Sequence, residues 1–208
     1  LSVTYFAPPT EEGKSAEAIP IILLHEWEGN RKQLLNYAAY LQKQGYAVIV
    51  PDLRGHGGST GLAGSTVSID AKKFRKQQVA SVQKDIERCK KFLVQRNNAG
   101  EVNIDLLSMV AVGQTSVLAM QWVLNDWFAY PPVNADGIKQ GRDIKALVLI
   151  SPQKKLNGIS LMGNMKHSLY TGAGGVAMPM MIVWAEEDDL AAKDAKSMFE
   201  SLEKVRPD

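Results

Sequence analysis

Short apolar runs alternate with longer amphipathic segments along the chain. Five runs of five or six residues are almost entirely apolar and predict strands: 21–25, 47–51, 107–112, 146–150 and 180–184. Each run is continuous rather than alternating, which is typical of a parallel strand that is covered on both faces. A further segment, 2–6, precedes a Pro-Pro pair and predicts an edge strand.

Between the apolar runs, apolar side chains recur at the spacing of a helix face. Four segments have this pattern: 31–44, 77–96, 116–128 and 192–204. Strands that alternate with helices are the signal of parallel βαβ units. The pattern therefore predicts an α/β fold, a three-layer sandwich in which a mostly parallel sheet has helices on both faces.

We interpret residues 1–208 as one domain, because 208 residues with 45% hydrophobic and 22% charged content can bury a full core. Within this domain, segment 151–178 is rich in Gly and Met and shows no clear periodicity. It follows a predicted strand end, where loops often carry function. We therefore predict a cap or lid there.

Charge and cysteine content exclude several classes of partner and chemistry. A formal net charge of +2 gives no reason to expect nucleic acid or an anionic membrane. No apolar run approaches the roughly 20 residues needed to span a bilayer. Cys89 is the only cysteine, so it forms no internal disulfide, and its helical neighbours predict burial. No metal-ligand or dinucleotide-binding pattern is present, so we expect no metal and no cofactor.

The segment after the third apolar run contains the most informative chemistry. Here an apolar strand runs into Gly113-Gln114-Thr115-Ser116-Val117 and then a helix. The pattern is similar to the nucleophile elbow Gly-x-nucleophile-x-Gly, which lifts one reactive side chain above the sheet edge. Thr115 occupies the nucleophile slot, where the elbow would require a positive φ that a β-branched residue resists. Val117 also replaces the second glycine.

Three landmarks in this order resemble the α/β-hydrolase superfamily, over about residues 18–205. They are the His-led loop of 22–29, the Asp-Leu-Arg-Gly-His-Gly run of 52–57 and the elbow. The loop that begins His25-Glu26-Trp27 is similar in particular to the dienelactone hydrolase branch. In that branch the glutamate interacts with a cysteine nucleophile, and the elbow here has no cysteine.

The resemblance implies a site built from a nucleophile, a His base, an acid and two backbone N–H groups for the oxyanion. Thr115 would be the nucleophile, whereas Ser116 would point along the helix. The N–H groups of Ser116 and Trp27 would be the oxyanion donors. Asp188 fits the acid slot, and Asp189 is next. Both acids could instead cap the following helix.

The base is the largest gap. The resemblance places it after the acid, but the chain's three histidines all precede Asp188. We predict that His25 shapes the site floor and that His56 lies in a surface turn, while His167 would have to reach inward from the lid. A hydroxyl without a base is scarcely nucleophilic. The sequence therefore predicts little or no hydrolysis.

Two hypotheses remain open. The first is a hydrolase-family protein with a degenerate site, which binds a small acyl, ester or carbonyl ligand, or a protein, without cutting it. The second is an active carboxylic-ester hydrolase, of esterase or dienelactone hydrolase type, whose catalytic His lies beyond Asp208. The segment as given also lacks the last strand and helix usual for the family, which predicts an exposed sheet edge or a dimer contact. Oligomeric state and cellular compartment are not assigned.

Overall fold

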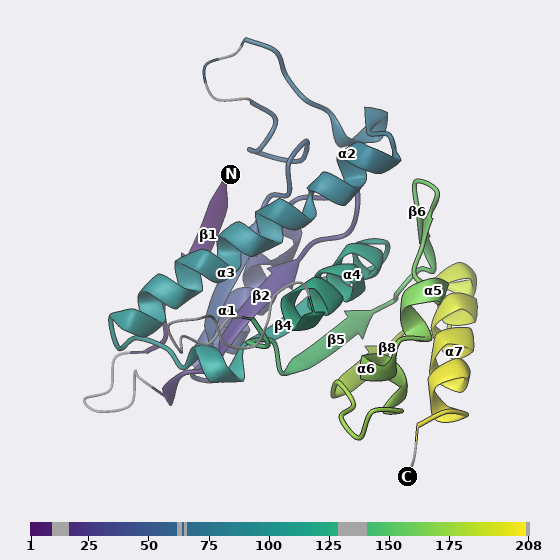
Figure 1. Ribbon diagram of the computed structural model, residues 1–208. Coiled ribbons are helices and arrows are strands. Elements are labelled where there is room, and N and C mark those ends of the chain that lie inside the picture. The colour runs from purple at the N-terminus through teal and green to yellow at the C-terminus, as the bar shows by residue number, and fades with distance from the viewer. Residues whose placement is uncertain (10–16, 62–63, 65, 129–140, 207–208) are drawn as a thin grey trace.

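The computed structural model describes residues 1–9, 17–61, 64, 66–128 and 141–206. Its centre is a six-stranded sheet in the order β1-β3-β2-β4-β5-β8 (Figure 1). Only β1 is antiparallel to its neighbour, and the other four pairings are parallel. The strands are β1 (Val3–Phe6), β2 (Pro20–Leu24), β3 (Ala47–Pro51), β4 (Ser108–Val112), β5 (Ala146–Ile150) and β8 (Met180–Val183). A strand is present at each of the six predicted positions. β2 and β3 are buried at every position, as expected of strands covered on both faces, whereas the burial of β8 alternates.

Helices cover both faces of this sheet, which confirms the predicted three-layer architecture. On one face, α1 (Leu35–Lys43) follows a short 3-10 helix, η2 (Arg31–Leu34), and packs over a small apolar core. On the other face lie α3 (Gln83–Asn98), α4 (Thr115–Phe128) and α7 (Asp189–Glu203), over a larger core. Two further 3-10 turns are η3 (Ala71–Lys73) and η4 (Ile104–Leu106).

The helix predicted over 77–96 is interrupted. Val82 separates α2 (Lys76–Ser81) from α3, because the backbone there forms i to i+3 hydrogen bonds from Val82 N to Val79 O and from Asp85 N to Val82 O. The apolar stripe continues across the interruption, with Val79, Val82 and Ile86 all buried. Periodicity alone therefore could not reveal the change in backbone hydrogen bonding.

Segment 151–178 packs against the end of the sandwich. It contains the hairpin β6 (Lys155–Leu156) and β7 (Ile159–Ser160), then α5 (Met162–Met165) and α6 (Ser168–Thr171). The Tyr170 hydroxyl is fully buried and donates a 2.6 Å hydrogen bond to the Met120 carbonyl of α4. These contacts join the segment to the main core, and its role as a lid stays a prediction.

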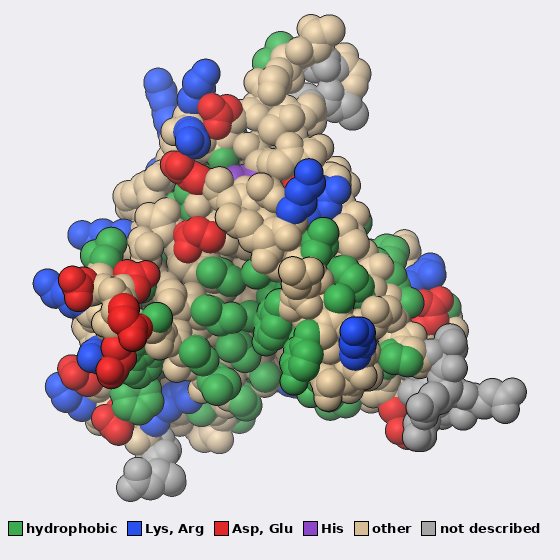
Figure 2. Space-filling model, turned by 180° about the vertical axis from the view of Figure 1, so that it is seen from behind, with side chains coloured by type: hydrophobic (Ala, Val, Ile, Leu, Met, Phe, Trp, Pro, Cys, Tyr) green, Lys and Arg blue, Asp and Glu red, His purple; other side chains and the backbone are tan. Residues whose placement is uncertain are grey.

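The sheet ends at β8, which pairs only with β5 among the described strands. On the α1 side of β8, the side chains of Met181 and Val183 are 60% and 39% exposed. Figure 2 shows this side of the molecule, where hydrophobic side chains gather over a broad area. Among the described residues, β8 is thus the last strand of the sheet, and its face on the α1 side is uncovered. No helix among the described residues is both long and apolar enough to cross a membrane.

A buried ion pair anchors the loop after β3 to α3. The Asp85 carboxylate is fully buried and accepts hydrogen bonds from the Arg54 backbone N–H and Nε, each at 2.9 Å, and from Arg54 Nη2 at 2.6 Å. Asp52, at the start of the same loop, accepts from the backbone N–H of Arg31 and of Gly58, each at 2.7 Å. The Asp-Leu-Arg-Gly-His-Gly run thus builds a rigid loop.

We expect Asp85→Ala to lower the free energy of unfolding by about 3 kcal/mol, because it leaves a partly buried guanidinium and a backbone N–H without their partner. Chemical denaturation measures this change. Lys91→Ala, at an exposed position of the same helix, is the control and should shift stability by less than about 0.5 kcal/mol. Equal effects from the two substitutions would contradict a structural role for the Arg54–Asp85 pair.

Candidate active site

The candidate site lies where the loops after β2 and β4 meet. These strands are parallel neighbours, with Leu24 in register with Ala111, so their carboxyl ends reach the same sheet edge. The β2 loop carries His25, Glu26 and Trp27, and the β4 loop carries Gly113 and Gln114. In open α/β sheets, this edge is where ligands bind.

The turn after β4 places its unusual backbone conformation at Gly113, not at Thr115. Gly113 has a φ of +58°, whereas Thr115 is the first residue of α4 and does not have a positive φ. The sequence prediction of a strained Thr115 is therefore wrong. The helix begins one residue earlier than predicted, and the positive φ lies two residues earlier, at a glycine that adopts it without steric cost.

Both hydroxyls of the predicted nucleophile region are buried. Thr115 is fully buried, and its Oγ1 donates a 2.7 Å hydrogen bond to the Val112 carbonyl. Ser116 is also fully buried, and its Oγ has no hydrogen-bond partner among the described residues. The Ser116 backbone N–H donates to the Gly113 carbonyl at 3.2 Å, so it is not the predicted oxyanion donor.

The Glu26 carboxylate occupies the place where two backbone N–H groups converge. Glu26 Oε1 accepts hydrogen bonds from the N–H of Trp27 at 2.9 Å and of Gln114 at 3.0 Å. The N–H of Trp27, which the sequence analysis proposes as an oxyanion donor, thus points at the same oxygen as the N–H of Gln114. Two converging N–H groups on one oxygen are the geometry of an oxyanion hole.

The second oxygen of Glu26 lies directly against the turn. A Cβ built on Gly113 would come within 1.4 Å of Glu26 Oε2. Because non-bonded heavy atoms cannot approach so closely, any side chain at position 113 would have to push Glu26 aside. The sequence analysis missed the roles of Gly113 and Gln114, although a glycine directly after a buried strand is a signal of a turn with positive φ.

Burial raises the pKa of Glu26 above its usual value of 4.5, although hydrogen bonds from the Gln114 and Trp27 N–H groups oppose this shift. The negative charge of Asp188 adds to the increase, so the two carboxylates are electrostatically coupled. Asp188 Oδ1 also caps α7 by accepting a 3.1 Å hydrogen bond from Ala191 N. Of the two alternatives for Asp188, the capping role is therefore observed. Asp189 is the exposed first residue of α7.

His25 uses both of its ring nitrogens to hold the β2 loop. Nδ1 lies 2.7 Å from the Glu26 carbonyl, and Nε2 accepts a 3.1 Å hydrogen bond from the Leu53 N–H, which implies a proton on Nδ1. The ring is fully buried, and this burial lowers its pKa to about 4. His25 is therefore a neutral structural residue at the site floor.

The prediction that His56 lies in a surface turn is wrong, because this residue is only 4% exposed. Its Nδ1 lies 3.1 Å from the Arg54 carbonyl, and its ring contacts Trp27 edge-on with centroids 4.6 Å apart. The loop folds back on itself through a 2.8 Å hydrogen bond from Ser59 N to the His56 carbonyl, which turns the ring inward.

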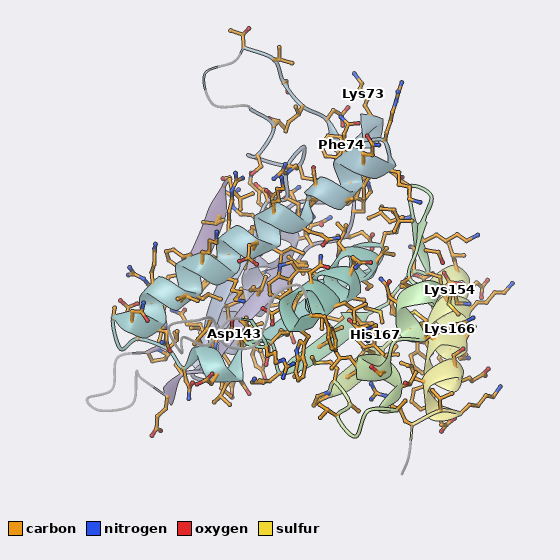
Figure 3. The ribbon with its side chains drawn as sticks, in the orientation of Figure 1. Lys73, Phe74, Asp143, Lys154, Lys166 and His167 are labelled. Atoms are coloured by element: carbon orange, nitrogen blue, oxygen red, sulfur yellow. The ribbon has the colours of Figure 1, made fainter. Side chains whose placement is uncertain are left out.

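His167 lies at the other end of α4. Its ring packs against Phe128, the last residue of that helix, at 4.6 Å, and its Nδ1 accepts from Leu169 N at 3.2 Å. Since α4 has 14 residues, a rise of about 1.5 Å per residue places its ends roughly 20 Å apart. In Figure 3, His167 is correspondingly distant from Phe74, whose ring neighbours Trp27. The hypothesis that His167 reaches into the site is therefore wrong.

No group of three or more His, Cys, Asp or Glu side chains within the described ranges is arranged to hold a metal ion. The polar groups that the structure places at this edge include two backbone N–H donors, two carboxylates and two buried hydroxyls.

The sheet order, the covering helices and the strand-to-helix turn together define the α/β-hydrolase fold. Solved structures share it at low sequence identity. Pyrococcus horikoshii acylaminoacyl peptidase has a TM-score of 0.61 at 13% identity, covering 98% of this chain and 33% of that chain. TT1662 from Thermus thermophilus has a TM-score of 0.59 at 15% identity, covering 100% and 81%. Thermogutta terrifontis esterase 2, phosphoramylated by tabun, has a TM-score of 0.57 at 14% identity, covering 98% and 73%.

The family is narrower than the fold. The sequence pattern of the dienelactone hydrolase family matches residues 4–115, more than half of the 208 residues, and the chain belongs to this family. No curated protein sequence matches the chain. The chain spans between 33% and 45% of the length of the first four similar solved structures.

We expect the stability advantage of the wild type over His25→Gln to shrink as the pH falls from 6.5 towards 4. Because the pKa of His25 is lowered in the folded state, the unfolded chain takes up the proton first, and the contribution of His25 is lost across this range. At pH 7 the wild type should be more stable by about 1 to 3 kcal/mol, since His25→Gln disturbs two buried hydrogen bonds.

Urea denaturation at several pH values measures this difference. His167→Gln, at the far end of α4, is the control for losing a histidine elsewhere. A difference between wild type and His25→Gln that is constant from pH 7 to pH 4 would contradict the assignment of His25 as a buried neutral ring.

Proposed function

We propose that this member of the dienelactone hydrolase family has a degenerate active site, which binds a small acyl or carbonyl compound, or a protein, without hydrolysing it. The observation that carries the proposal is Gly113. The elbow of hydrolases holds its nucleophile at the turn of positive φ between strand and helix. Here a glycine with no side chain has that conformation.

The neighbouring hydroxyls do not replace the missing nucleophile. Thr115 Oγ1 is buried and donates a hydrogen bond to a backbone carbonyl, and Ser116 Oγ is buried without a hydrogen-bond partner among the described residues. A hydroxyl needs a base that accepts its proton. The rings of His25 and His56 are held by the backbone, and that of His167 is at the far end of α4.

The two N–H groups of Trp27 and Gln114 support the binding half of the proposal. Such donors stabilise a developing oxyanion in an active enzyme, and they hydrogen-bond a carbonyl or carboxylate oxygen when no chemistry follows. A protein that has an oxyanion hole but no nucleophile can bind acyl compounds without hydrolysing them.

An active carboxylic-ester hydrolase is the alternative. One observation favours it: the negative charge of Asp188, the predicted acid, acts on Glu26, whose carboxylate accepts from the two N–H donors. This alternative needs a histidine from outside residues 1–208 and a nucleophile at the turn. Gly113 counts against the second requirement.

We expect the wild type to hydrolyse p-nitrophenyl acetate and butyrate no faster than buffer does, and to remain unlabelled by a fluorophosphonate probe. Thr115→Ser should gain no activity, because a primary hydroxyl at this buried position still lacks a base. An active esterase of the same family serves as the positive control. Hydrolysis by the wild type that disappears in Thr115→Ala would overturn the degenerate-site proposal.

The same assays on the full encoded protein separate the two candidate functions. Hydrolysis that depends on a histidine outside residues 1–208 would establish the ester hydrolase and overturn the proposal. Equal inactivity of the longer protein would support it.

A further inference from the structure

The carboxylate of Glu26 fills the oxyanion hole as a bound ligand would. We propose that Glu26 is an internal ligand of this hole, and that the external ligand is a short-chain monocarboxylate, which binds by displacing it. This inference rests on the proposed binding function and extends it to a ligand class and to the residue that regulates access.

The hydrogen-bond geometry favours a carboxylate over a neutral ester. A single oxygen, Glu26 Oε1, accepts from both Trp27 N at 2.9 Å and Gln114 N at 3.0 Å. Hydrogen bonds to an ionised acceptor are roughly twice as strong as those between neutral groups. A free carboxylate therefore competes for these two donors better than an ester carbonyl does.

Gly113 makes the internal ligand possible. Glu26 Oε2 lies where a side chain at position 113 would begin, 1.4 Å from the site of its Cβ. The space left by the missing nucleophile is thus the space that the Glu26 carboxylate enters. Gly113 and Glu26 act together, because a larger residue at 113 would expel the carboxylate from the hole.

The occupancy of the hole by Glu26 is not tightly locked. Glu26 is only partly buried. Burial raises its pKa, and the coupled charge of Asp188, at the turn before α7, raises it further. Both effects disfavour the ionised form of Glu26, so the carboxylate is protonated, and its hold on the two N–H groups weakened, at a higher pH than for a free glutamate. The charged group known to face Glu26 is Asp188, and the polar contacts are the N–H groups of Trp27 and Gln114.

Propionate tests the inference, because it reproduces the end of a glutamate side chain. We expect Glu26→Ala to bind propionate about tenfold or more tightly than the wild type, with ¹H–¹⁵N shift changes at the Trp27 and Gln114 amides. Propionamide should bind Glu26→Ala more weakly than propionate does, because its neutral oxygen is a weaker acceptor. Glu28→Gln is the matched control, since Glu28 lies in the same loop but is exposed and pairs with Lys72 at 3.5 Å. It should behave as the wild type does.

A second measurement begins with the wild type. In the wild type, the Trp27 and Gln114 amide shifts should titrate together, with a common midpoint above pH 4.5, as Glu26 ionises. Gly113→Ala, which expels Glu26 without removing its carboxylate, should abolish this shared titration. Amides that do not follow the titration in the wild type would overturn the inference, as would equal propionate affinity in wild type and Glu26→Ala.

The two proposals fail in distinguishable ways. Ester hydrolysis by a protein whose Glu26→Ala variant still binds propionate overturns the proposed lack of hydrolysis and supports the inference about Glu26. No hydrolysis together with no propionate binding by a folded Glu26→Ala variant overturns the inference and leaves the lack of hydrolysis standing.

Discussion

The Glu26 carboxylate accepts hydrogen bonds from two backbone N–H groups, and these bonds join the two halves of the candidate site. Glu26 belongs to the loop after β2, and Gln114 belongs to the turn after β4, so the 3.0 Å hydrogen bond between them crosses the central pair of strands. His25 fixes the preceding backbone by bridging Glu26 and Leu53. The position of the carboxylate thus depends on three loops at the same sheet edge, each fixed by a buried polar group.

The fold could be predicted from the sequence because strands that are buried on both faces consist of continuous apolar runs. β2 and β3 are apolar at every position, as a strand covered on both faces must be. The break at Val82 left no signal, because the same apolar stripe serves α2 and α3. A glycine-rich loop is typical of the protein surface, which predicts an exposed His56. This loop is instead folded inward by its own backbone hydrogen bonds.

The site was harder to predict than the fold. A motif fixes the spacing between residues but not which residue adopts the positive φ. This conformation lies at Gly113, two residues before Thr115. The family, the loop with Glu26 and the Trp27 N–H donor were all recognisable from sequence. The position of the Glu26 carboxylate was not, because it depends on a contact across 88 residues of chain.

Gly113 also constrains how the protein could change over generations. A serine or cysteine introduced there would collide with Glu26 Oε2, and removal of Glu26 alone would leave the two N–H groups of Trp27 and Gln114 without their acceptor. A side chain at position 113 therefore requires the Glu26 carboxylate to move, and removal of Glu26 requires another acceptor for the two N–H groups. The two positions are therefore energetically linked, so that a substitution at one of them changes which residues the other tolerates.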